Sequence, residues 1–214
     1  MPYRHTDRVE ARLADNRERI LRAARTLIAD GGFREAQIIA IAAAAGLATG
    51  TLYRYFPSKA DLFAELLRVI CERELAVTNS IASSGGPALA RIRSAVGAFS
   101  RRALRARRLA YAIIVEPVDP EVDQVRLEYR RAQTRVFASM IREGIDSGDL
   151  PSQNVETSAA CLVGAFLEGL VSPLSHGLEL DDESAGRLLE EIESFAVRAV
   201  SGKEQVDGDL PRDP

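Results

Sequence analysis

The sequence predicts an all-α protein, with a small N-terminal domain of three helices followed by a larger helical domain. Two observations lead to this fold class. Apolar residues recur at steps of three and four along most of the chain, which is the spacing of one face of an α-helix. Ala, Leu, Arg and Glu, all good helix formers, are frequent. No segment shows the alternation of a half-buried strand, and a hydrophobic share of 46% leaves enough apolar material for a core.

Glycines separate the first three predicted helices. Asp30-Gly31-Gly32 ends the first, because glycine suits the left-handed position after a helix. A short helix follows, and Gly46 stops it. A second short helix begins near Thr49 and ends before Pro57. The apolar stripe of the first helix consists of Ile20, Ala23, Ala24, Leu27 and Ile28.

The helix after Pro57 is predicted to begin at Ser58, where Ser58 and Asp61 approximate a capping box. It runs into the high 70s and links the two domains. Further helices are predicted at 87–104, 106–115, 120–146, 153–174 and 182–201. We therefore divide the chain into an N-terminal domain of residues 1–60, a helical domain of residues 61–201 and a disordered tail of residues 202–214.

Charge is distributed unevenly between these parts. The whole chain has a formal net charge of −3. Residues 1–60 carry ten Lys or Arg and six Asp or Glu, whereas the remainder carries eighteen and twenty-five. A basic N-terminal module on an acidic body is expected where only one end of a protein faces phosphate. Arg4, Arg8 and Arg12 form either an arm that supports DNA binding or a solvated leader.

Residues 38–63 read IIAIAAAAGLATGTLYRYFPSKADLF and predict a helix-turn-helix. Small alanines allow the helices to approach closely, and Gly46 permits the turn between them. The second short helix then presents its polar residues outward, where a recognition helix meets the major groove. Tyr55 and Lys59 suit phosphate oxygens. The candidate DNA-binding residues are Thr49, Gly50, Thr51, Tyr53, Arg54, Tyr55 and Lys59.

This segment resembles the DNA-binding domain of the TetR family of transcriptional regulators, of the TetR/AcrR type. In that family a helix-turn-helix is followed by a pattern like G-x-L-Y-x-Y/H-F-x-x-K-x-x-L, and the resemblance covers about residues 15–65. The matching residues are Gly50, Leu52, Tyr53, Tyr55, Phe56, Lys59 and Leu62. The resemblance implies a homodimeric repressor that binds double-stranded operator DNA and is released by a small-molecule effector.

Two positions depart from the family pattern. Ala36 and Gln37 stand where many relatives place Thr and then Ser or Thr, so a side-chain cap is lost. Ala48-Thr49 replaces a common Ser-Lys or Ser-Arg, and Thr49 is expected to cap the recognition helix instead. These changes leave the predicted fold intact and bear on the operator sequence.

The helical domain is predicted to bind a mostly apolar ligand, with the helix from Ser58 as the lever that releases DNA. The arginine cluster between Arg101 and Arg108 is either a solvated helix end or an anion site. The residues expected to line the cavity, with plain core packing as the alternative for each, are Phe99, Leu104, Tyr111, Ile114, Phe137, Met140 and Phe166.

The last two predicted helices are expected to form a four-helix dimer bundle with those of a second copy. Packing within one chain explains part of their apolar character. The expected interface residues are Leu162, Phe166, Leu170, Leu188, Ile192 and Phe195.

Two other functional classes were weighed against this interpretation. An enzyme lacks support, since the sequence shows no Gly-rich phosphate loop, no metal-ligand cluster and only two histidines. A structural adaptor would not need the polar residues between Tyr53 and Lys59 beside a turn glycine. We expect no cofactor, no metal and no membrane segment, a cytoplasmic location, and two buried, reduced cysteines, Cys71 and Cys161.

Overall fold

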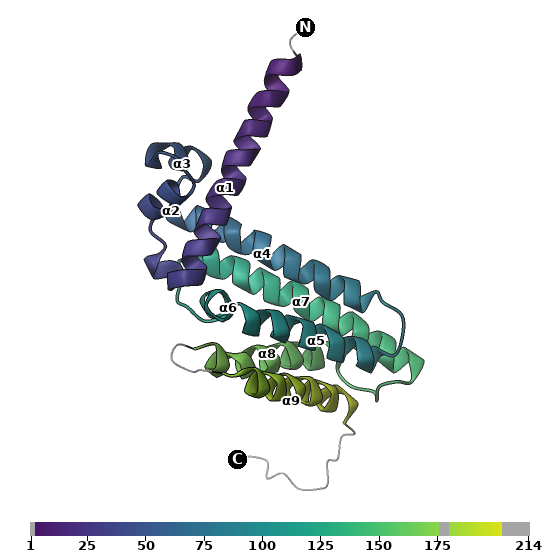
Figure 1. Cartoon of the computed structure of the whole chain (residues 1–214). Coiled ribbons are helices and arrows are strands. Elements are labelled where there is room, and N and C mark those ends of the chain that lie inside the picture. Colours follow the sequence, from purple (N-terminus) through teal and green to yellow (C-terminus); the bar gives the residue numbers. More distant parts are fainter. Residues whose placement is uncertain (1–2, 176–179, 203–214) are drawn as a thin grey trace, which may run out of the picture.

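The structure is a computed structural model that describes residues 3–175 and 180–202, and these residues form helices and no strand (Figure 1). The helices are α1 (Tyr3–Glu35), α2 (Ile38–Ala44), α3 (Thr49–Tyr55), α4 (Lys59–Ala82), α5 (Ala88–Arg105), α6 (Arg107–Ile114), α7 (Pro120–Ser147), α8 (Val155–Leu174) and α9 (Asp182–Ser201). The predicted all-α class is confirmed. The tail predicted for residues 202–214 falls outside the described residues, apart from Gly202.

Helix α1 is longer than the apolar stripe suggested. It begins at Tyr3, so the basic leader belongs to the helix, and its N-terminal part projects beyond the rest of the molecule (Figure 1). Its later turns bury Ile20, Ala24 and Ile28. Gly32 interrupts it with φ 81° and ψ −177°, a combination that is open essentially only to glycine.

Helices α2 and α3 pack against α1 and form the predicted helix-turn-helix. Gly46 has φ 65°, and Arg19 of α1 closes the turn by donating a hydrogen bond to the carbonyl of Ala45 at 2.6 Å. Leu52 of α3 is fully buried, as is Ile41 of α2. The short helices are therefore held by their apolar faces, because neither has a side-chain cap at its N-terminus.

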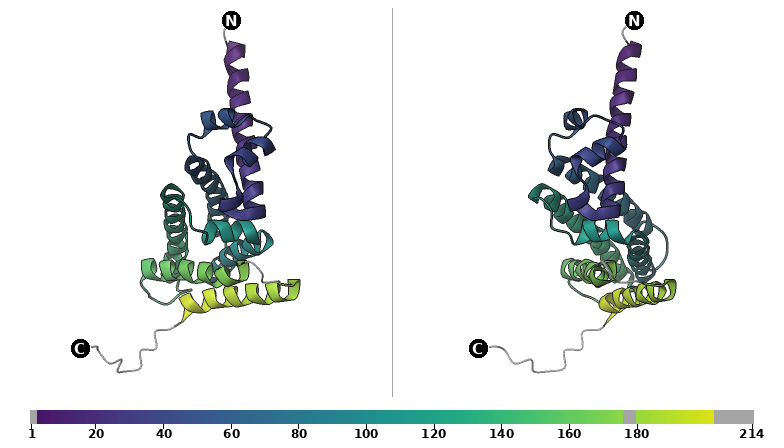
Figure 2. Two further views of the ribbon diagram at one scale, coloured as in Figure 1. Left: turned by 90° about the vertical axis from the view of Figure 1, so that its left-hand side faces the viewer. Right: turned by 60° about the vertical axis from the view of Figure 1, so that its left-hand side comes forward.

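The remaining helices form a bundle below this domain, and α4 runs beside α7 (Figure 1). Ser58 caps α4, since its Oγ accepts from the backbone N–H of Asp61 at 3.0 Å. Helices α8 and α9 lie at the end of the molecule opposite to α2 and α3 (Figure 2).

Two apolar cores hold the molecule together. The first joins α1 to α4 and also takes in Leu109 and Ala112 of α6 and Val122 and Val125 of α7. The second joins α5, the later part of α7, α8 and α9. The apolar packing of the N-terminal domain thus extends past residue 60 into elements that follow it in the sequence.

Helix α8 is long and apolar enough to span a membrane by length and composition alone. Its apolar face packs in the second core, where Leu162, Phe166 and Leu170 are buried. A core helix passes the same test of length and composition.

Candidate functional site

The outer face of α3 is a polar surface at the end of the molecule. Gly50, Tyr53 and Arg54 are exposed, and Tyr53 exposes 47% of its surface although it is aromatic. Thr49 and Thr51 are partly exposed beside them. A Cβ at Gly50 would meet no atom within 4 Å, so this side of the helix is open to a partner.

Two further residues predicted to contact phosphate are held in position by neighbours. The side-chain amide of Asn16 donates to the hydroxyl of Tyr55 at 3.0 Å, which joins α3 to α1 and leaves the phenolic proton available to an acceptor. The Lys59 ammonium lies 5.2 Å from the centroid of the Phe63 ring, at the N-terminus of α4. Both polar groups therefore border the surface formed by α3.

The expected capping role of Thr49 is wrong. Ala48 occupies the N-cap position of α3, and no side chain accepts from the first N–H groups of this helix. Thr49 is the first helical residue, and its own backbone N–H is one of the groups left without a side-chain acceptor.

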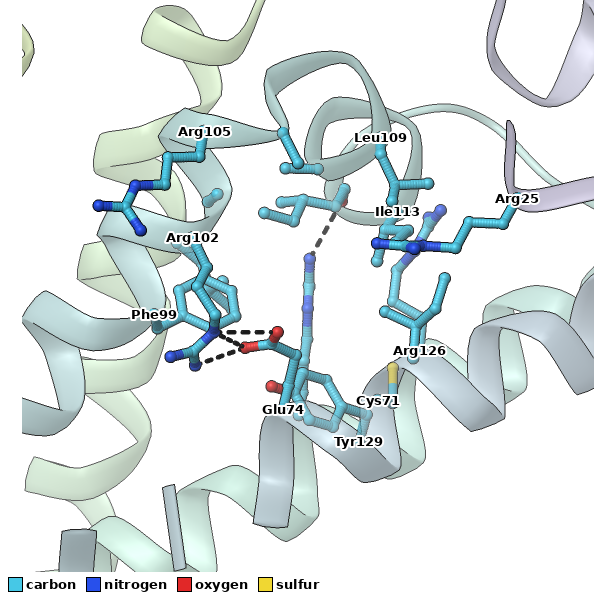
Figure 3. A pocket seen from close by; sticks show the side chains of 17 residues that line it. Arg25, Cys71, Glu74, Phe99, Arg102, Arg105, Leu109, Ile113, Arg126 and Tyr129 are labelled. Carbon is cyan, nitrogen blue, oxygen red and sulfur yellow. Dashed lines mark hydrogen bonds and ion pairs between the residues drawn. The ribbon is translucent and has the colours of Figure 1, made fainter. Parts of the chain in front are cut away.

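A cavity of about 270 Å³ lies among α4, α5, α6 and α7 (Figure 3). Most of its wall is apolar, with contributions from Ile70, Leu109 and Ile113. Charged side chains also reach this wall, namely Arg25, Glu74, Arg102, Arg105, Arg126 and Arg130. Arg102 donates to the Glu74 carboxylate through Nε at 3.1 Å and through Nη2 at 2.6 Å, and Figure 3 shows the pair facing each other. The charges of Arg102 and Glu74 neutralise each other, and the apolar part of the wall suits an apolar molecule.

Tyr129 and Cys71 lie close together at the floor of this cavity (Figure 3). Burial raises the pKa of the Cys71 thiol to about 12 and raises the pKa of Tyr129, so both groups stay protonated at neutral pH. The Tyr129 hydroxyl is buried, and the described residues offer it no hydrogen-bond partner. It is therefore a group that could pair with a ligand after a small rearrangement.

Comparison with known proteins identifies the family. The family described as "Bacterial regulatory proteins, tetR family" matches residues 20–66. The chain is also 30% identical, over 197 residues, to the HTH-type transcriptional repressor KstR of Mycolicibacterium smegmatis, and the match covers 89% of each chain. The chain belongs to the TetR family. It is therefore a DNA-binding transcriptional regulator, and regulators of this family are not enzymes in general.

Solved structures share the whole TetR-family fold. FadR of Bacillus subtilis, in complex with stearoyl-CoA, has a TM-score of 0.74 and is 20% identical, with 85% of this chain and 98% of that chain covered. A TetR/AcrR-family regulator from Thermobifida fusca has a TM-score of 0.69 and is 23% identical, with 86% and 97% covered. The arrangement of DNA-binding and C-terminal helices is thus common to proteins with dissimilar sequences.

The residues that were predicted to line the ligand cavity lie in different parts of the structure. Phe99 and Ile114 line the cavity described above. Phe137, Met140 and Phe166 are core residues with at most 1% of their surface exposed, so for them the alternative of plain core packing holds. Tyr111 borders a different cleft, and Leu104 packs on the second core.

The sequence-based prediction missed the polar residues of the cavity. Glu74, Arg102, Arg126 and Tyr129 come from three helices and share no local motif, so only the packing of α4, α5 and α7 brings them together. The sole available signal was that each lies on the inner side of an amphipathic helix.

The arginine cluster of residues 101–108 is largely paired. Arg101 lies 3.6 Å from the Glu193 carboxylate, Arg102 binds Glu74, and Arg107 donates to the carbonyl of Pro173 at 2.8 Å. Arg108 pairs with Glu116. Arg105 is exposed and is the one member of the cluster that forms no hydrogen bond or ion pair with a described residue.

Arg108 and Glu116 form a clamp around the end of α1, which we call the α6 clamp. Arg108 donates to the carbonyl of Gly31 at 2.6 Å, and Glu116 accepts from the backbone N–H of Phe33 at 2.9 Å. A Cβ at Gly32 would collide with both side chains of the clamp. The C-terminal end of α1 is thus attached to α6, whose other face lines the cavity.

The helices α8 and α9 place the predicted interface residues in two environments. Leu162, Phe166, Leu170 and Ile192 are buried within one chain, because α8 and α9 pack against α5 and α7. These four face the core of the protomer and not its surface. Leu188 is partly exposed, and Phe195 exposes 46% of its surface. The outer face of α8 carries exposed small residues instead, and Cys161 among them is exposed, contrary to the prediction of a buried thiol.

Proposed function

We propose that the protein is a repressor that binds operator DNA as a homodimer and leaves it when a small, mostly apolar molecule enters the cavity. The exposed face of α3 carries the proposal, since an exposed tyrosine and arginine beside a glycine form a surface that the fold does not need for its own packing. Similarity to a protein named as a transcriptional repressor supports the direction of regulation. We also propose a cytoplasmic location and no catalytic activity, because the chain is similar to transcriptional regulators.

The α3 surface divides into residues that read bases and residues that bind phosphate. Tyr53 and Arg54, with Thr49, Gly50 and Thr51, approach base edges in the major groove. Tyr55 and Lys59 sit at the border of that surface and bind the DNA backbone. The first group sets the operator sequence, and the second sets affinity and its dependence on salt.

Release of DNA requires that the ligand bind one arrangement of the two domains more tightly than the other. The α6 clamp supplies a connection, because Leu109 and Ile113 line the cavity while Arg108 on the same helix holds Gly31. Helix α4, the lever expected from the sequence, also lines the cavity and binds α1 through Glu65 and Arg17, 2.5 Å apart. We propose that both helices transmit the movement to α1.

An acyl thioester is a reasonable first ligand to test, since FadR of Bacillus subtilis was solved with stearoyl-CoA in a protein of the same fold. The apolar wall of the cavity supports the acyl portion. Burying an acyl chain stabilises the complex by roughly 0.8 kcal/mol for each buried CH₂ group.

We propose that the dimer interface consists of the outer faces of α8 and α9. Of the interface residues expected from the sequence, Leu188 and Phe195 remain in this proposal, and the exposed small residues of α8 join them. Gly164 is exposed, and a Cβ there would meet no atom within 4 Å in the protomer. Gly164→Glu should therefore leave the protomer folded and prevent a close helix pair. Gly85→Glu, at an equally open position in the loop between α4 and α5, is the matched control.

The decisive experiment is a gel-shift titration with DNA from upstream of the gene, combined with sedimentation of each variant. Wild type should bind as a dimer, with its two recognition helices about 34–36 Å apart or a multiple of this. Gly164→Glu and Phe195→Glu should give monomers with lower operator affinity, whereas Gly85→Glu should match wild type. If both interface variants remain dimers, the proposed interface is wrong. If wild type does not bind the upstream DNA specifically, the proposed function is wrong.

A further inference from the structure

The apolar cavity adjoins a groove lined by arginines. The groove runs between α1 and the turn that joins α5 to α6, and it shares Arg25, Arg105, Ala106 and Leu109 with the cavity. Four of its eight lining residues are arginines, and none is acidic. A molecule in the cavity can therefore extend into a cationic groove without leaving the protein surface.

Two of these arginines already have partners, as described for Arg107 and Arg108. Arg25 and Arg105 form no hydrogen bond or ion pair with any described residue. Figure 3 shows them on opposite sides of the cavity, with the Arg25 side chain reaching toward it from α1 and the Arg105 side chain extending away from it at the end of α5. The two cations at the edge of the cavity thus lack neutralising groups.

Other arginines of α1 provide an informative contrast. Arg17 pairs with Glu65, Arg19 with Asp15 and Arg22 with Glu18. Inside the cavity, Arg102 is neutralised by Glu74. Arg25 lies one turn after Arg22 and borders both the cavity and the groove, but the described part of the chain places no carboxylate near enough to pair with it.

We propose that the effector is an anionic amphiphile, with its apolar body in the cavity and its phosphate or carboxylate in the arginine groove beside Arg25 and Arg105. This inference rests on the proposed function and adds the ligand class. Guanidinium groups bind such anions through charge-assisted hydrogen bonds, often two at a time. Because Arg25 belongs to α1, the anionic group also links the DNA-binding domain to the ligand, and its charge contributes to the position of α1.

Decyl phosphate and 1-decanol test this directly, because they share an apolar chain and differ in the anionic group. Their affinities are measured by calorimetry below the concentrations at which either compound aggregates. Wild type should bind decyl phosphate at least about tenfold more tightly than 1-decanol. The double variant Arg25→Gln with Arg105→Gln should lose most of that preference and bind 1-decanol as wild type does.

Arg22→Gln and Arg101→Gln are the matched controls, since they lie one turn away on the same two helices and line neither the cavity nor the groove. Both should keep the preference for decyl phosphate. Equal affinity of wild type for the two compounds, equal weakening in the controls, or no binding of either compound would overturn the proposal. Operator binding by the ligand-free protein is measured in parallel. If wild type does not bind the operator, the proposed function is contradicted, independently of the ligand class.

Discussion

The two apolar cores differ in how completely their interior groups are satisfied. The first core, around α1 to α4, contains alanines, aliphatic side chains and the rings of Phe33, Phe56 and Phe63, and its elements are joined by hydrogen bonds such as that of Asn16 to Tyr55. The second core is centred on Phe99, Phe137 and Phe166, and it also buries Ser100 and Gln133. The side-chain polar atoms of those two residues have no partner among the described residues.

Unpartnered buried polar groups lower the free energy of unfolding, because they lose water without gaining a hydrogen bond. Among the described residues, α1 to α4 contain no buried side-chain polar atom without a partner, whereas the hydroxyl of Tyr129, which borders the cavity on α7, has none. This difference suits a regulator, because a ligand that pairs with the Tyr129 hydroxyl makes a hydrogen bond that the protein alone does not make.

The largest expected effect comes from removing an aromatic ring from either core. Phe63→Ala and Phe166→Ala, at 2% and 1% exposure, should each lower the free energy of unfolding by about 3–5 kcal/mol. Leu127→Ala, on the surface of α7, is the control and should stay within about 0.5 kcal/mol. Because the first core includes residues of α6 and α7, urea unfolding should remain one transition in both variants. Two transitions in Phe166→Ala would show that the cores unfold separately.

Substitutions at two glycines test how much the α6 clamp matters compared with an ordinary helix end. Gly32 and Gly148 have φ 81° and 80°, but only Gly32 has side chains packed where a Cβ would stand. Gly148→Ala should cost about 1 kcal/mol, and Gly32→Ala should cost more, about 2–3 kcal/mol, and should alter operator affinity. Equal melting temperatures and unchanged operator affinity in both variants would show that the clamp does not position α1.

A smaller effect is expected at the border of the DNA surface. Lys59→Ala should weaken specific and non-specific DNA binding alike and reduce the slope of log K against log salt by about one unit, since a phosphate contact carries little sequence information. The variant also loses the contact of the Lys59 ammonium with the Phe63 ring, which should cost at most about 1 kcal/mol of stability and leave the protein folded. A salt titration that gives the wild-type slope would rule out the phosphate contact.

The smallest effect concerns the ion pair between α1 and α4. The Arg17 guanidinium lowers the pKa of Glu65, so the pair stabilises the folded state above the ordinary carboxyl pKa, and this contribution disappears as the pH falls through the lowered value. The loss of stability in Arg17→Ala should therefore be about 0.2–1 kcal/mol larger at pH 7 than at strongly acidic pH, where only the contact of Arg17 with the Phe56 ring is lost. Urea titrations at pH 7, 5 and 3 measure this, and a constant difference across that range would contradict the assignment.

The local features of the fold were predictable because they depend on neighbours in the sequence. The turn at Gly46 follows α2 where expected, Gly32 interrupts α1 where an end was expected although the helix resumes to Glu35, Ser58 caps α4, and the bounds from α4 to α9 fall within a few residues of the predicted ranges. The DNA-binding surface was predictable for the same reason, since α3 is a short helix whose apolar and polar faces follow from a period of 3.6 residues.

The sequence by itself thus determined the helices, the helix-turn-helix and the family, all of which rest on spacing over a few turns. Only the tertiary structure decided which apolar residues meet the cavity, which lie in the core and which reach the surface. Phe166 and Phe195 show the reason: both lie on apolar helix faces, yet Phe166 packs against Phe99 and Phe137 while Phe195 faces outward. The orientation of a helix in a bundle depends on all of its neighbours, so contacts such as Arg102 with Glu74 and Arg108 with Gly31 follow from packing and not from spacing.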